Sequence, residues 1–172
     1  MAHSIKRIKI AVSSCLLGEP VLYDGNNKDN QTVRALCEIF ECVSICPECL
    51  IGLGVPRPPI HIVKISKRFH AQGKANPGLD VTQSLETLAT EVAKNNNSIC
   101  GYVLKARSPS CGIDSTPWRN ESTKENGTTS GIYSAKIQKL MPTLPFIEET
   151  DLENPTKMEE FVEKVKGHVA QL

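Results

Sequence analysis

Short apolar runs alternate along the chain with helical segments, and this alternation limits the possible folds more than any other feature of the sequence. The runs predicted as strands are 8–13, 42–46, 60–65, 100–104 and 144–147. The segments predicted as helices are 33–40, 81–92, 131–140 and 155–169. Parallel strands need a crossover connection, which a helix usually supplies. The sequence therefore predicts an α/β fold: a single domain over residues 1–172 with a mostly parallel sheet and helices on both faces.

Two irregular segments interrupt this pattern. Residues 52–59 hold two glycines and three prolines around Arg57, which predicts a stiff loop after the second strand. Residues 108–131 are rich in Ser, Thr, Gly, Asn and Pro and have little periodicity. We predict a long loop there, and loops of that length are often functional.

The charge and the hydropathy pattern exclude several classes of protein. With 20 basic and 19 acidic residues the formal charge is +1, so no broad basic surface for nucleic acid is expected. No stretch approaches the roughly 18–20 apolar residues that span a bilayer, and the N-terminal residues lack the small-residue cleavage site of an export signal. We expect a cytoplasmic protein with no membrane partner. Its seven cysteines, an odd number, are then expected to be reduced thiols.

Three of those cysteines lie directly after predicted strands. Cys15, Cys46 and Cys111 each occupy a loop with Gly or Pro at the carboxyl end of a strand. Ligands of parallel α/β sheets bind at that edge, because loops from several strands converge there. The fold would bring the three thiols together. The residues alone leave open whether the thiols form a functional site or are ordinary buried cysteines.

The remaining cysteines have simpler explanations. Cys37 lies on an apolar helix stripe and Cys42 and Cys100 begin strands, so we expect all three to be small core residues. Cys49 follows Cys46 in a Cys-x-x-Cys pattern, which alone is typical of a zinc half-site or a redox pair. Neither a second such pair nor a nearby histidine completes a zinc ligand set.

Three motifs resemble those of one enzyme family. They are Val-Ser-Ser-Cys-Leu-Leu-Gly-Glu-Pro-Val-Leu-Tyr-Asp-Gly (12–25), Cys-Pro-Glu (46–48) with Gly-Leu-Gly-Val-Pro-Arg-Pro-Pro (52–59), and Leu-Lys-Ala-Arg-Ser-Pro-Ser-Cys-Gly (104–112). In this order they are similar to the thiouracil desulfurase family, and the likeness runs from about residue 8 to residue 148. Three separate motifs in one order make a chance match unlikely.

The resemblance implies an iron-sulfur enzyme that replaces the sulfur of a thiolated uracil base or nucleotide with oxygen. It implies that Cys15, Cys46 and Cys111 bind a 4Fe-4S cluster and that Glu48 and Ser108 are catalytic. Three thiolates leave one iron of such a cluster without a protein ligand, and that iron can bind the substrate sulfur. The expected reaction is a nonredox, hydrolytic cleavage of the carbon-sulfur bond, in which Glu48 serves as general base and acid.

The substrate side of the site is less sharply defined by the sequence. Tyr23 is a candidate for stacking on a pyrimidine and Arg57 for binding a phosphate or carbonyl, although Tyr23 also suits packing and Arg57 a carboxylate partner. The chain departs from the family pattern at Leu22 and Asn27, where arginine and histidine are usual, and it lacks a second Tyr-Asp-Gly element after Cys111. These departures bear on the substrate rather than on the cluster.

Other functions fit parts of the same pattern. A rival hypothesis is that the same cluster acts on thiouridine in transfer RNA, but near-neutral charge favours a small thiolated pyrimidine as the partner. A noncatalytic iron-sulfur or zinc protein would keep the cysteines without needing Glu48. A small-ligand binding domain with structural thiols is a third class.

Overall fold

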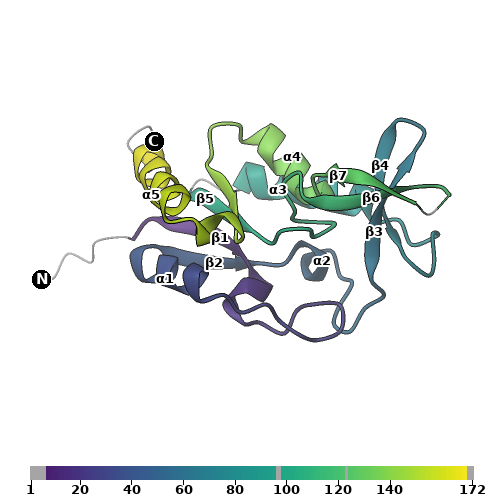
Figure 1. The fold of residues 1–172 in the computed structure, drawn as a ribbon, viewed down its shortest axis with the longest axis horizontal. Helices are drawn as coiled ribbons and strands as arrows, with labels where there is room; N and C mark the ends of the chain where they lie inside the picture. The colour runs from purple at the N-terminus through teal and green to yellow at the C-terminus, as the bar shows by residue number, and fades with distance from the viewer. Residues whose placement is uncertain (1–6, 96–97, 123, 170–172) are drawn as a thin grey trace, which may run out of the picture.

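The computed structural model describes residues 7–95, 98–122 and 124–169, and these residues form the expected α/β fold (Figure 1). The central sheet has the strand order β2-β1-β5-β8, and all of its pairs are parallel. Its strands are β1 (Lys9–Ser13), β2 (Glu41–Ile45), β5 (Ile99–Leu104) and β8 (Phe146–Glu148). The predicted strands 8–13, 42–46, 100–104 and 144–147 correspond to these four.

Helices cover both faces of the central sheet, as predicted. The helices are α1 (Gln31–Ile39), α2 (Pro47–Leu50), α3 (Thr82–Asn95), α4 (Ile132–Leu140) and α5 (Pro155–Val169), with short 3-10 turns η1 (Ser14–Leu17) and η2 (Asp151–Glu153). Ile10 and Val12 of β1 pack in the cluster formed with α1 and α5, whereas Ala11 packs in the cluster formed with α3 and α4. This alternation follows from the two-residue period of a strand.

A second sheet lies beyond α3 and α4. The sequence predicted its strand 60–65, which is β3, but not the other three strands or the sheet itself. Its order is β4-β3-β6-β7, with β3 (Ile60–Ile65), β4 (Arg68–Gly73), β6 (Thr116–Asn120) and β7 (Glu125–Thr129). The prediction of one long loop over 108–131 was therefore wrong for β6 and β7. Both strands are mostly polar and β7 is an exposed edge, so neither shows the hydrophobic alternation by which strands are recognised.

Side-chain caps set the beginnings of three helices. The Asn30 side chain accepts a hydrogen bond from the Val33 amide at 3.0 Å, and Asp80 accepts one from the Thr82 amide at 3.0 Å. Asn154 accepts one from Thr156 at 3.0 Å. Each bond satisfies an amide that has no partner inside its helix.

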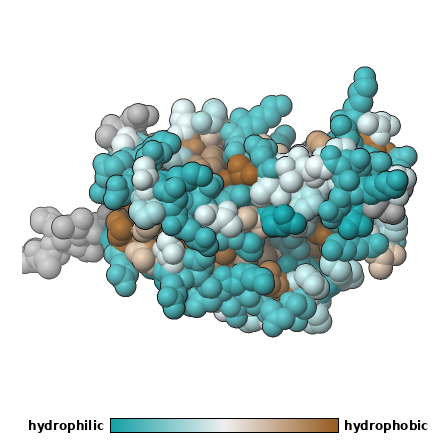
Figure 2. Space-filling view, in the orientation of Figure 1, coloured by the Kyte–Doolittle hydropathy of each residue, from teal (hydrophilic) through white to brown (hydrophobic). Residues whose placement is uncertain are grey.

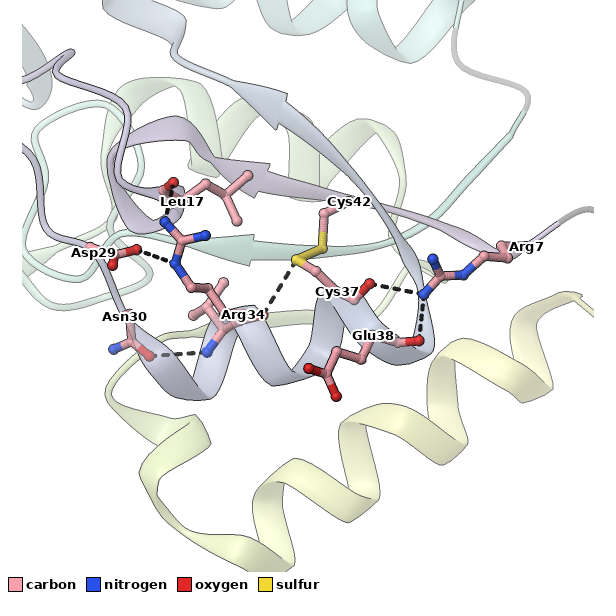
Figure 3. Close-up of a disulfide and its surroundings, with 9 residues drawn as sticks. Arg7, Leu17, Asp29, Asn30, Arg34, Cys37, Glu38 and Cys42 are labelled. Carbon is pink, nitrogen blue, oxygen red and sulfur yellow. Dashed lines mark hydrogen bonds and ion pairs between the residues drawn. A yellow bond between two sulfur atoms is a disulfide. The ribbon is translucent and has the colours of Figure 1, made fainter.

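The structure corrects the expectation that all cysteines are reduced. Cys37, at the end of α1, forms a disulfide with Cys42 of β2, and both are half-buried rather than core residues (Figure 3). Arg7 donates hydrogen bonds to the carbonyls of Cys37 and Glu38 at 2.8 and 2.5 Å. A short turn between helix and strand brings the two cysteines together, which a pattern of apolar residues does not reveal. Cys100 is a buried core residue as expected.

The visible surface is mostly hydrophilic, with small separate hydrophobic areas (Figure 2). Within the described residues, no helix combines the length and the apolar character that a bilayer span requires.

Candidate active site

The three strand-end cysteines follow three neighbouring strands of the central sheet. Cys15 lies in the η1 turn after β1, Cys46 directly follows β2, and Cys111 lies in the loop after β5. Because these strands are parallel and adjacent in the order β2-β1-β5, their carboxyl ends share one edge. The predicted convergence is therefore a consequence of the strand order.

One cavity of about 280 Å³ is lined by all three of these cysteines. Cys15 and Cys111 are buried and Cys46 is half-buried. Cys15, Cys46 and Glu48 are near enough to the Cys111 thiol to influence its ionisation, so these groups share one site. The walls combine apolar and basic side chains, which include Val21, Leu22, Pro59, Ile60, Lys28, Lys74, Lys105 and Arg107.

Burial keeps the three thiols protonated in the absence of a metal. It raises the pKa of Cys15 to about 11 and the pKa of Cys46 to about 12. It raises the pKa of the Cys111 thiol further still. Metal binding must therefore displace protons from these sulfurs, and a metal is the partner that makes buried thiolates stable.

The loop that carries Cys111 is fixed by the start of α4. The amides of Gly131, Ile132 and Ser134 donate to loop carbonyls at 2.9–3.0 Å. The accepting carbonyls are those of Gly112, Pro109 and Ser110 respectively. A helix leaves its first amides without internal partners, and the loop supplies them. At Gly131 a Cβ atom would lie 2.5 Å from the Ser110 carbonyl carbon, so only glycine permits this approach.

The Glu48 carboxylate faces the cavity and is held at both oxygens. Arg57 Nε donates to Oε2 at 2.8 Å, and the Ser110 hydroxyl donates to Oε1 at 2.9 Å. Both side chains of the ion pair are nearly excluded from solvent, at 4% for Arg57 and 13% for Glu48. Through Glu48 the Cys46 segment is therefore joined to the Cys111 loop and to the stiff loop that follows α2.

The three cysteines that line the cavity are donors of the type that binds an iron-sulfur cluster. Among the described residues, no three His, Cys, Asp or Glu side chains lie close enough to hold one metal ion. In an iron-sulfur cluster each thiolate binds its own iron, so the sulfurs surround the group instead of meeting at a point.

Comparison with known proteins shows the family of the chain. The family model described as 2-thiouracil desulfurase matches residues 10–149. The chain belongs to this family. A solved structure of the [4Fe-4S]-dependent thiouracil desulfidase TudS is 28% identical, with a TM-score of 0.63 over 86% of this chain and 94% of that one. No curated protein matches the chain. The family resemblance inferred from the three motifs is confirmed.

Arg57 lines the cavity, but its guanidinium is paired with a carboxylate. Its Nε binds Glu48 and its Nη1 donates to the Gly54 carbonyl at 3.0 Å and contacts the Cys49 sulfur at 3.7 Å. Burial opposes the charge of Arg57, but the hydrogen bond and charge of Glu48 outweigh it and raise the pKa of the guanidinium. The carboxylate alternative that the sequence left open is the contact present in the structure.

Ser108 and Tyr23 both line the cavity. The Ser108 hydroxyl oxygen accepts hydrogen bonds from the amides of Ser110 and Cys111 at 3.3 and 3.1 Å, so it shapes the turn that presents Cys111. Its own proton remains available to a substrate or water. Tyr23 is half exposed at the rim, and its carbonyl accepts from the Arg57 amide at 2.8 Å.

Ser110 is the site residue that sequence reasoning missed. It is 1% exposed and is the serine that contacts Glu48, whereas the motif suggested only Ser108. The signal was present in Ser-Pro-Ser-Cys, where two serines flank the proline, but the sequence does not say which hydroxyl faces the carboxylate.

Proposed function

We propose that the protein is a desulfidase that exchanges the sulfur of a thiolated uracil base or nucleotide for oxygen and releases sulfide. Family membership and the likeness to the [4Fe-4S]-dependent enzyme TudS support this proposal. The observation that carries it is the cavity in which Cys15, Cys46 and Cys111 surround a space faced by the Glu48 carboxylate.

We assign the three cysteines as ligands of a [4Fe-4S] cluster. The chemistry of the donors supports this: three thiols line one cavity, and no fourth described cysteine lines it. When bound, the cluster would supply a thiophilic Lewis acid at its iron without a cysteine ligand, which polarises the carbon-sulfur bond. Cys49 lies further along α2 with its sulfur against Arg57 instead.

We assign Glu48 as the general base. Its carboxylate takes a proton from the water that attacks the ring carbon, and it returns the proton as the hydrosulfide leaves. Water supplies the oxygen, the carbon-sulfur bond breaks heterolytically, and no electrons are gained or lost overall. Arg57 and Ser110 fix the direction of the carboxylate, since each holds one of its oxygens. Ser108 is placed to donate its hydroxyl proton to the substrate or to the water.

The walls of the cavity suit a pyrimidine that carries negative charge. Leu22 and Ile60 provide apolar surface for a ring, and Tyr23 is available at the rim for stacking. Lys28 and Arg107 add positive charge, which favours a nucleotide phosphate over an uncharged base. A formal charge of only +1 argues for this small substrate over transfer RNA.

The test replaces Glu48 by Gln in enzyme reconstituted anaerobically with iron and sulfide. Glu48→Gln preserves size and the Arg57 contact but removes the base, so sulfide release from thiouracil is expected to fall by about 10²–10⁴-fold. The visible absorption of the cluster should stay unchanged. Glu163→Gln on the exposed face of α5 is the matched control and should keep full activity.

The same measurement separates enzyme from binding protein. Unchanged sulfide release by Glu48→Gln with an intact cluster would remove Glu48 from the mechanism. An intact cluster in the wild type with no sulfide release from thiouracil or its nucleotide would favour a noncatalytic iron-sulfur protein.

A further inference from the structure

A buried carboxylate at the end of β8 contacts the loop that carries Cys111. Glu148 is 7% exposed, and its Oε1 accepts hydrogen bonds from the Ile113 amide at 2.6 Å and from the Ser115 hydroxyl at 2.5 Å. Both donors belong to the loop, and no ion pair of Glu148 occurs among the described residues. A carboxylate is costly to bury without a cation, so the hydrogen bonds from the loop are its main compensation.

The Ser115 hydroxyl extends this contact to the beginning of the loop. Its oxygen accepts from the Arg107 amide at 2.8 Å, while its proton goes to Glu148. Arg107 has a φ of 62°, in the left-handed region that costs energy for a residue with a Cβ atom. The bond to Ser115 helps to hold that conformation, so Glu148 and Ser115 together close residues 107–115 into a ring.

The ring contains the loop residues that the proposed function uses. Ser108 directly follows Arg107, and its hydroxyl oxygen accepts from the Cys111 amide at 3.1 Å. The Ser108 carbonyl accepts from the Gly112 amide at 2.9 Å and from the Thr116 hydroxyl at 2.8 Å. If the ring opened, Ser108 and Cys111 would therefore move together.

The register of the central sheet explains why Glu148 reaches this loop. Leu104, the last residue of β5, lies beside Glu148, the last residue of β8. The chain leaves β5 at that point, so the loop begins next to the carboxylate. The following residue, Glu149, accepts from the Ala106 amide at 2.6 Å. Two consecutive glutamates thus hold two parts of one loop.

We propose that Glu148, acting with Ser115, is a positioning residue that holds residues 107–115 in the conformation that presents Cys111 and Ser108 to the cavity. Neither Glu148 nor Ser115 lines the cavity, so both act through the loop. The inference rests on the proposed function for the roles of Cys111 and Ser108. The contacts themselves need neither a cluster nor a substrate, and they can be tested without either.

The experiment measures the rate at which iodoacetamide alkylates Cys111 in the folded, iron-free protein, with peptide mass spectrometry to assign each thiol. A buried thiol reacts only when its segment opens, so the rate reports opening of the loop. Glu148→Ala and Ser115→Ala should each raise the Cys111 rate by about 10-fold or more, because each removes a hydrogen bond that involves a charged group. Cys100, buried in β5, is the internal reference and should keep its wild-type rate.

Two more variants separate positioning of the loop from general stability. Glu148→Gln keeps an oxygen acceptor at the same place, so it should restore most of the protection of Cys111. Glu163→Ala on the exposed face of α5 is the matched control and should leave the rate unchanged. If Glu148→Ala does not fold, Ser115→Ala carries the test, since it removes a single oxygen atom.

The possible results are distinguishable. A wild-type Cys111 rate in both Ala variants would overturn this inference and leave the proposed function intact. Equal acceleration of Cys111 and Cys100 would overturn it as well, because the change would then be general unfolding, and so would a Gln variant as reactive as the Ala variant. Selective acceleration of Cys111 in a protein whose wild type takes up no cluster would support the inference and overturn the proposed cofactor.

Discussion

Replacing Arg57 by Met should destabilise the protein strongly, because it leaves a carboxylate without its ionic partner in a poorly solvated site. Met keeps much of the apolar stem of the arginine and removes only the guanidinium. The Glu48 carboxylate would retain the Ser110 hydroxyl at 2.9 Å but lose the Arg57 contact at 2.8 Å. The guanidinium also binds the Gly54 carbonyl, so two loops lose an anchor at once.

The burial of the pair sets the size of the effect. With exposures of 4% and 13%, the pair belongs to the class in which loss of one partner costs about 3–5 kcal/mol. For a domain of this length, such a loss corresponds to a fall in Tm of about 6–20 °C. The exposed pair of Arg68 and Glu86 gives the contrast, and Arg68→Met should cost less than about 1 kcal/mol.

Urea unfolding of the iron-free protein, followed by circular dichroism, measures both changes. A double-mutant cycle with Glu48→Met, which removes the same contact from the carboxylate side, isolates the pair. The sum of the two single losses should exceed the loss in the double variant by about 2 kcal/mol. Losses that add within about 0.5 kcal/mol would refute the reasoning, since they would show that the two side chains do not depend on each other.

Three further predictions concern the loop, the thiols and a helix cap. Gly131→Ala should lower Tm and cluster content, because the added Cβ would lie 2.5 Å from the Ser110 backbone. Gly167→Ala in α5 is the control: its added Cβ has no atom within 4 Å, and alanine favours a helix over glycine, so Tm should rise slightly. The free energy of unfolding of the iron-free protein, measured with urea, should fall as the pH rises from 9 toward about 11. In the unfolded chain Cys15 ionises at its ordinary pKa of 9.0, whereas the buried thiol stays protonated up to a pKa of about 11. Cys15→Ala should make this fall less steep. Asp80→Ala should lower the free energy of unfolding by about 1 kcal/mol in the same assay, since the first amide of α3 loses its hydrogen bond to the Asp80 carboxylate. An unchanged free energy would contradict the role of Asp80 as a helix cap.

The sequence was sufficient for the central sheet and for placing three cysteines at the carboxyl ends of its strands. Buried parallel strands such as Ile99–Leu104 are continuous apolar runs, and their burial is what makes them visible in the sequence. The position of Cys15, Cys46 and Cys111 after such strands follows directly. What the sequence lacked was the order β2-β1-β5, which makes the three strand ends neighbours.

The second sheet and several contacts were beyond this reasoning for physical reasons. A polar edge strand such as Glu125–Thr129 is stabilised by its backbone partner and not by burial of its side chains. The pairing of Lys105 with Glu149, 44 positions apart, depends on the geometry of the sheet edge. The Cys37–Cys42 disulfide depends on the short turn between α1 and β2, which no periodicity of apolar residues encodes.

The central claim is that Cys15, Cys46 and Cys111 together bind an iron-sulfur cluster, and its most direct test is iron analysis after anaerobic reconstitution with iron and sulfide. The account predicts about four iron atoms per wild-type chain and loss of bound iron when any of the three is replaced by Ala. Cys49→Ala and Cys100→Ala should retain the full content, since neither sulfur lines the cavity. A colourless, iron-free wild-type protein, or a full cluster in Cys111→Ala, would contradict it.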